Sequence, residues 1–178
     1  REAPFSFGPA RLEGSLRRDR GDAYLEANLH AEEIDALGQR TRLSGPIEAK
    51  LTPRAFTLSG DLRAPQDAPA LFSRARLTAS LSYDRDRQRF ALERAELVGD
   101  AVRVDASGWT NRGEGEFAGA WRARRLEAFV PGLSGEAEGR WRAISRPGAH
   151  ERIWHTNIDG AGARVAGDAP LLPQLLGA

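Results

Sequence analysis

The side chains that could carry catalysis or bind a metal are few and scattered. The three histidines are His30, His150 and His155, and no pair has the spacing that places two imidazoles on one helix face. The chain has no cysteine, so thiolate nucleophiles, thiolate metal sites and disulfides are excluded. These residues predict no metal site.

The carboxylates favour surface ion pairs over acid–base catalysis. Glu136 and Glu138 share the polar phase of one segment with Arg140 and Arg142, which is typical of a charge ladder on a wet strand face. The stretch 160–163, Gly-Ala-Gly-Ala, lacks the spacing and the following lysine of a phosphate-binding loop. We therefore expect a protein that is not an enzyme and uses no cofactor.

Composition narrows the classes of partner. The 26 basic and 25 acidic residues are mixed along the chain and give a net charge of +1, so no field of one sign attracts nucleic acid. Apolar runs are far shorter than the roughly 20 residues that a membrane-spanning helix needs. The 178 residues contain no methionine, so we expect a piece of a longer protein.

The main pattern is alternation of apolar and polar residues, which is typical of strands with one wet face. It is clear in Ala75–Tyr83 and Leu133–Ala143, and short turn sequences such as Asn111–Gly113 separate the alternating segments. The sequence predicts an all-β, elongated, mostly antiparallel curved sheet with one to three short helices. The helices are expected where the alternation breaks, at Ala31 to Gly38, Leu126 to Val130 and Pro170 to Leu176.

An apolar-x-Gly-x-apolar pattern recurs along the chain. Its glycines stand in phase with the apolar residues, at Gly14, Gly45, Gly60, Gly119 and Gly135. A glycine on the apolar face lets a sheet bend or another group approach closely, which suits a sheet wrapped around a groove. The same pattern also fits bulges in an ordinary β-sandwich.

The aromatic residues leave a second interpretation open. Trp121 and Trp141 stand in the apolar phase, whereas Trp109 stands in the polar phase. Exposed rings at Trp109 and Trp154 would suit a sugar-binding platform, so a β-sandwich carbohydrate-binding or adhesion module is an alternative. An outer-membrane barrel is a third interpretation, which the aromatic content of only 7% disfavours.

The apolar phase supplies the candidate binding residues. In a sandwich two such faces fill each other, whereas in one folded-over sheet they line an open trough. The candidate lining residues of this trough are Leu12, Leu16, Leu25, Leu29, Ile47, Leu51, Phe56, Leu58, Leu62, Leu77, Leu81, Phe90, Leu92, Val102, Val104, Phe117, Trp121, Leu133 and Trp141.

Several longer segments carry a family resemblance. The glycine pattern, Leu97–Gly108, Leu126–Gly135 and Asp168–Gly177 resemble TamB, the inner-membrane component of the translocation and assembly module, within the AsmA-like group. The resemblance implies a U-shaped β-groove, or β-taco, with an apolar concave face. Residues 1–178 would form a single segment of it, with repeat junctions near 31–45 and 124–135.

The resemblance also implies a function and partners. Its members are anchored in the inner membrane, cross the periplasm and are associated with carrying phospholipid acyl chains toward the outer membrane. With TamA, an outer-membrane partner of the Omp85 type, they are tied to the assembly of autotransporters and other outer-membrane proteins. Lipid transport and polypeptide chaperoning both stay open, and exposed terminal strands would allow end-to-end self-association.

Overall fold

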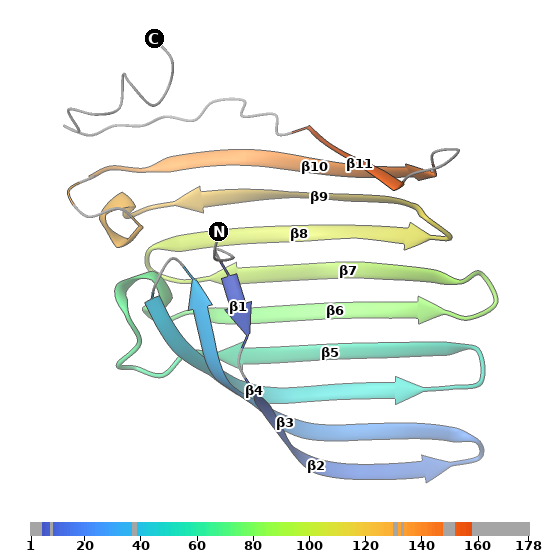
Figure 1. Cartoon of the computed structure of the whole chain (residues 1–178). Helices are drawn as coiled ribbons and strands as arrows, with labels where there is room; N and C mark the ends of the chain where they lie inside the picture. Colours follow the sequence, from blue (N-terminus) through green and yellow to red (C-terminus); the bar gives the residue numbers. More distant parts are fainter. Residues whose placement is uncertain are drawn as a thin grey trace.

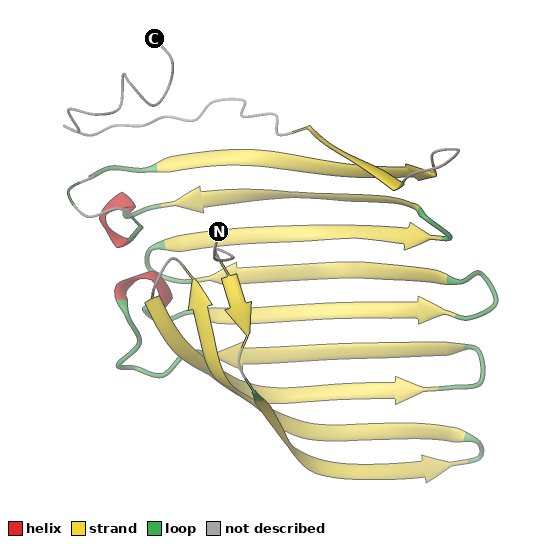
Figure 2. Ribbon diagram, in the orientation of Figure 1, coloured by secondary structure: helices red, strands yellow, loops and turns green. Residues whose placement is uncertain are grey.

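The described part of the chain forms one open antiparallel sheet of eleven strands in the computed structural model (Figures 1 and 2). The structure describes residues 5–7, 9–36, 39–129, 132, 134–147 and 152–157. The strands are β1 (Phe5–Phe7), β2 (Ala10–Asp19), β3 (Asp22–Ala36), β4 (Gln39–Leu51), β5 (Ala55–Arg63), β6 (Arg76–Asp84), β7 (Arg89–Val98), β8 (Val102–Asn111), β9 (Glu114–Ala123), β10 (Ala137–Pro147) and β11 (Arg152–Asn157).

The strands follow one another through the sheet as a meander. From β3 to β11 each strand pairs with its neighbour in sequence, and β1 and β2 both pair with β3. Two 3-10 turns interrupt the order, η1 (Ala70–Phe72) after β5 and η2 (Leu126–Ala128) after β9. The predicted all-β, antiparallel, curved sheet is confirmed. The described residues form no second sheet, so the alternative of a closed sandwich is wrong for this part of the chain.

The helix expected at Ala31 to Gly38 is wrong, because β3 continues to Ala36. The register shifts between Ala31 and Ile34, which are both buried, while Glu32 and Glu33 between them are exposed. Two polar residues between two apolar ones imitate helical spacing, yet here they form a β-bulge that returns Ile34 to the apolar face.

The other two helix expectations have different outcomes. Leu126 to Val130 contains η2, a single 3-10 turn. Pro170 to Leu176 lies outside the described residues. The structure adds η1, whose Leu71 and Phe72 are buried.

A second bulge lies in β7. Leu92 pairs with Leu81 and Ala95 pairs with Ala79, so β7 holds one more residue than β6 over this interval. Both bulges stand in the second strand of a four-strand group that ends in a 3-10 turn, first β2 to β5 with η1 and then β6 to β9 with η2. The structure therefore repeats one unit of four strands and a 3-10 turn. Of the two repeat junctions expected from the sequence, the one near 124–135 contains η2, whereas the one near 31–45 falls in the β3–β4 hairpin.

The ends of β3 and β4 leave the plane of the sheet. The last pair between β4 and β5 is Ser44 with Arg63, and β4 residues before it pair with β3 alone. This segment, residues 31–36 and 39–43, is called the arm below, and it crosses in front of the sheet (Figure 1). Its Ile34 and Leu43 are only 3% and 4% exposed because they pack in a cluster with η1.

One side chain links the arm to both 3-10 turns. The Gln39 side-chain carbonyl accepts a hydrogen bond of 2.9 Å from the backbone N–H of Leu71 in η1. Its amide donates to the backbone carbonyl of Ala128 in η2. The arm therefore closes the apolar face at the end where η1 and η2 lie.

The β7 bulge gives a test of the sheet register. Deleting Glu93 removes the extra residue and leaves Leu92 and Ala95 in phase, so we expect a folded protein that loses less than about 2 kcal/mol. Deleting Thr78 from the regular strand β6 turns half of its apolar side chains to the charged face and should abolish cooperative folding. Urea unfolding compares the two deletions, and equal losses of stability would contradict this account.

Candidate functional site

The apolar residues of separate strands meet in rows that cross the sheet. Their alignment follows from the strand register alone, because opposite residues in antiparallel strands point to the same face. The row called the open row below consists of Leu16, Leu25, Ala49, Leu58, Leu81, Leu92, Gly108, Phe117 and Ala143. A parallel row of Leu62, Leu77, Leu97, Val104, Trp121 and Gly139 lies nearer the 3-10 turns.

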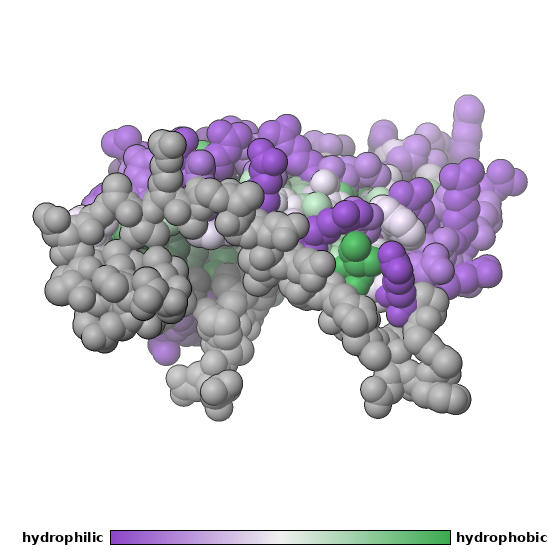
Figure 3. Space-filling view, turned by 90° about the horizontal axis from the view of Figure 1, so that it is seen from above, coloured by the Kyte–Doolittle hydropathy of each residue, from purple (hydrophilic) through white to green (hydrophobic). Residues whose placement is uncertain are grey.

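Away from the arm, no described element packs on most of this apolar face. Leu16 is 64% exposed and Leu12 is 49% exposed, and no large side chain among the described residues is less than 2% exposed. Facing sheets of a sandwich would bury such positions in a core about 10 Å thick. Figure 3 shows hydrophobic residues between hydrophilic ones in the part of this view that the described residues occupy. Among the described residues this apolar face is therefore only partly covered, and it is called the trough below.

The predicted lining residues occupy this face to different depths. Leu12, Leu16 and Leu51 are exposed, and Val102 is buried in the cluster beneath the arm. Leu133 lies outside the described residues. The half-buried ones are Leu25, Leu29, Ile47, Phe56, Leu58, Leu62, Leu77, Leu81, Phe90, Leu92, Val104, Phe117, Trp121 and Trp141.

Sequence reasoning missed two lining residues and the cluster that fills one end. Tyr83 pairs with both Phe56 and Phe90, and Leu97 pairs with Leu77. Leu97 was hidden because the bulge at Glu93 reverses the alternation in β7. The sequence did carry a signal for this bulge: Leu92 and Ala95 are separated by two consecutive polar residues, so they stand three positions apart instead of two.

Aromatic rings lie over glycines of neighbouring strands. Trp121 pairs with Gly139 and Trp141 pairs with Gly119 across β9 and β10. A Cβ on Gly139 would lie 2.8 Å from Trp121 Nε1, and one on Gly119 would lie 2.7 Å from Trp141 Nε1. The bulges of β3 and β7 occur away from these glycines. Close approach, rather than a bulge, thus explains glycine at these two positions.

The opposite face of the sheet is held by ion pairs between strands. Arg122 contacts Glu136 at 2.8 Å and Glu138 at 3.9 Å, and Arg142 contacts Glu116 at 2.8 Å. Glu136 and Glu138 thus join a cross-strand set of charges, as expected, although their partner is Arg122 rather than Arg140 or Arg142. Such exposed pairs contribute little stability individually, and they keep this face polar while the trough stays apolar.

Arg76 perturbs the electrostatics of Asp61 on this face. Arg76 forms two hydrogen bonds with its carboxylate, one of them 2.8 Å from Nε to Oδ1. These hydrogen bonds hold the pKa of Asp61 below its ordinary value. The negative charge of Asp61 is therefore balanced by the neighbouring Arg76 guanidinium.

The candidate aromatic and histidine sites do not combine into a binding site. Trp109 lies half-buried on the charged face, and the Arg89 guanidinium stands 5.0 Å from its ring centroid, so one ring face is occupied. His30 is half-buried, and the side chains of Trp154, His150 and His155 lie outside the described part. Among the described residues no three histidine or acidic side chains converge on a metal-sized site.

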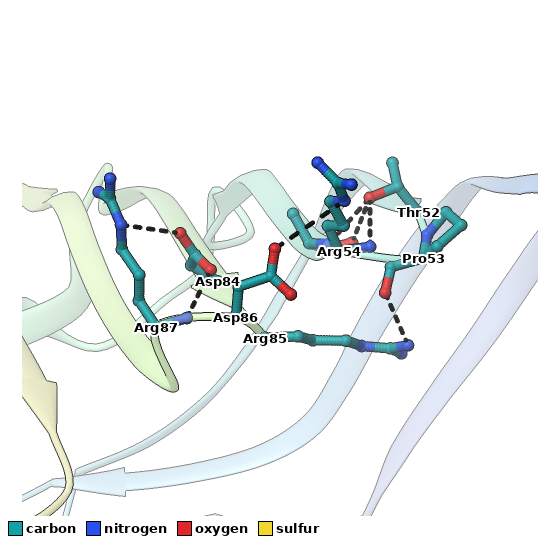
Figure 4. Close-up of polar contacts among 8 residues, drawn as sticks. Thr52, Pro53, Arg54, Asp84, Arg85, Asp86 and Arg87 are labelled. Atoms are coloured by element: carbon teal, nitrogen blue, oxygen red, sulfur yellow. Dashed lines mark hydrogen bonds and ion pairs between the residues drawn. The ribbon is translucent and has the colours of Figure 1, made fainter.

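The hairpin turns opposite η1 and η2 are tied to one another (Figure 4). The backbone N–H of Arg85 donates to the carbonyl of Arg54 at 2.8 Å, and the Arg85 guanidinium donates to the carbonyl of Pro53 at 3.3 Å. Arg54 also lies 3.9 Å from Asp86. These contacts join the β4–β5 turn to the β6–β7 turn along the trough margin.

Comparison with known proteins gives no family assignment. No family model, no curated protein and no solved structure matches the chain. In the described part, no helix combines the length and the apolar character that crossing a bilayer requires.

The ring-over-glycine contacts give a packing test. Gly139→Ala places a methyl group against the Trp121 indole, and we expect a loss of about 1–3 kcal/mol in the free energy of unfolding together with a changed tryptophan emission. Ala120→Val on the charged face of β9 is the control and should change neither. Unchanged stability in Gly139→Ala would show that the ring does not depend on the glycine.

Asp61 gives a test against pH. Because its folded-state pKa is depressed, its contribution to stability is present above its ordinary pKa of 3.8 and is lost as pH falls through the lower folded-state value. Asp61→Asn should therefore flatten the pH dependence of unfolding below about pH 4. Urea unfolding at pH 3 and pH 6 measures this difference, and an identical pH slope in both proteins would refute it.

Proposed function

We propose that this chain is a periplasmic segment of a TamB-like, AsmA-like protein anchored in the inner membrane, and that its trough carries phospholipid acyl chains between the two membranes. The observation that supports this proposal is the uncovered apolar face that crosses the strands from β2 to β10. Support for the parent protein comes from the sequence resemblance. Its outer-membrane partner would be TamA, and its wider role would include autotransporter assembly.

The dimensions of the trough suit acyl chains. From β2 to β10 there are eight strand spacings of about 4.8 Å, or about 38 Å in total. One leaflet of the hydrocarbon core is about 15 Å thick, so the trough is longer than the apolar part of one lipid. Each methylene moved from water to the trough contributes about 0.8 kcal/mol.

The chemistry of the rows suits movement better than storage. The open row contains only leucine, alanine, glycine and phenylalanine, which offer no hydrogen bond that would fix a lipid at one place. Contacts of this kind are non-directional, so a chain sliding from strand to strand meets similar surroundings. The charged face lies on the other side of the sheet, so a lipid headgroup would stay in water at the margin of the trough.

The alternatives have less support. A carbohydrate-binding sandwich would need a second sheet, which the described residues lack, and a free aromatic face, which Arg89 restricts at Trp109. Chaperoning of apolar polypeptide segments would use the same trough. Extraction of bound lipid distinguishes that role from lipid transport.

The structure selects the residues for this test. Leu81 and Leu92 pair with each other in the open row and are half-buried, and neither belongs to the cluster beneath the arm. Leu77 is a poorer choice because it packs against that cluster. Thr57 and Ser59 lie exposed on the adjacent strand β5 and provide a matched control on the other face.

The experiment compares phospholipid that co-purifies with three forms of the chain, measured by mass spectrometry after solvent extraction. We expect lipid on the unmodified chain and on Thr57→Asp/Ser59→Asp. Leu81→Asp/Leu92→Asp should carry about tenfold less, because each carboxylate would have to be desolvated against acyl chains. Absence of lipid from the unmodified chain, or equal lipid on all three folded proteins, would overturn the proposal.

A further inference from the structure

The strand β2 is an open edge of the sheet. It pairs with β3 over its whole length, from Ala10 with Ala31 to Asp19 with Asp22, and none of the described strands pairs with its other side. All ten of its residues are exposed. The backbone groups that point away from β3 can therefore accept another strand.

Two of the usual protections of an edge strand, proline and a β-bulge, are absent from β2, although five of its ten residues are charged. It contains no proline, its register with β3 has no shift, and its Leu12 and Leu16 are 49% and 64% exposed. Leu16 is also the last member of the open row, which ends at this edge. A regular edge without proline or bulge can pair with a further strand whose charges complement its own.

The charges of β2 specify a partner. On the face away from the trough the residues in order are Arg11, Glu13, Ser15, Arg17 and Asp19. Their signs reverse about Ser15, as plus, minus, neutral, plus, minus. Such a sequence is complementary to itself when two copies run antiparallel, because each positive position then meets a negative one.

The pairs follow from that register. Centred on Ser15, the antiparallel arrangement places Arg11 opposite Asp19 of the second copy and Glu13 opposite Arg17 of the second copy. The two-fold axis produces each of these pairs twice. In the single chain Arg11 lies 2.6 Å from Glu13 of its own strand. Both side chains are largely exposed, so they can exchange this contact for one with the second copy.

The trough face of β2 fits the same register. Leu16 would lie opposite Gly14 of the second copy, which repeats the arrangement of Trp121 over Gly139 within the sheet. Leu12 would lie opposite Arg18, whose methylene groups can cover it while its guanidinium stays in water. Even-numbered residues meet even-numbered residues, so both apolar faces point to the same side.

We propose that two copies of this chain join through their β2 edges, antiparallel and centred on Ser15, into one continuous sheet. The open row then runs from one copy into the other across Leu16 and Gly14. This interface depends only on the edge and its charges, so it stands whether or not the trough carries lipid. The occupant of the edge is a second copy because β2 is complementary to itself.

A charge-reversal cycle tests the register. Glu13→Arg alone sets like charges opposite each other in both copies, and so does Arg17→Glu alone, so each should raise the dimer dissociation constant at least about tenfold. The double variant restores opposite charges and should return it to the original value. Sedimentation equilibrium over a range of concentrations measures all four proteins, with circular dichroism confirming that each is folded.

A cross-link tests the centre of the interface. Because the chain has no cysteine, Ser15→Cys introduces the single thiol, and two copies should join rapidly through it under mild oxidation. Thr57→Cys, exposed on β5, is the control and should cross-link only slowly. A chain that is monomeric at all concentrations, or a dimer unaffected by either single charge reversal, would overturn the proposal.

Discussion

The structure depends on keeping the apolar residues of every strand in one phase. Antiparallel pairing transmits that phase from β2 to β10, so each strand adds one member to the same rows. The bulges of β3 and β7 preserve the phase where the sequence departs from strict alternation. A single sheet of this kind has one apolar face, which it must cover, fold around a ligand or leave in water.

The chain covers only part of that face itself. The arm brings Ile34 and Leu43 into one buried cluster with Val102 and the residues of η1, which creates a true core at one end. Gln39 holds this end together through backbone groups of η1 and η2. Away from the arm the rows stay half-exposed, because no other described element packs on them.

The proposed function and the proposed dimer both follow from this incomplete closure. An uncovered row of leucines has a hydrophobic driving force toward any apolar ligand that fits, and acyl chains have the required flexibility. The open edge at β2 has the corresponding need for backbone partners. A dimer would lengthen the trough, while its charged outer face would continue without a change of character.

The sequence by itself determined most of the strands and which residues lie on their apolar face, because period-two alternation is a local property of the chain. It did not determine the bulge at Glu32 and Glu33, since two polar residues between apolar ones also fit a helix and only pairing with β4 decides. Nor did it reveal the arm, because the buried cluster that holds both Ile34 and Val102 joins segments far apart in sequence. Whether the apolar face is closed or open likewise depends on tertiary structure, since alternation is the same in a sandwich and in a single sheet.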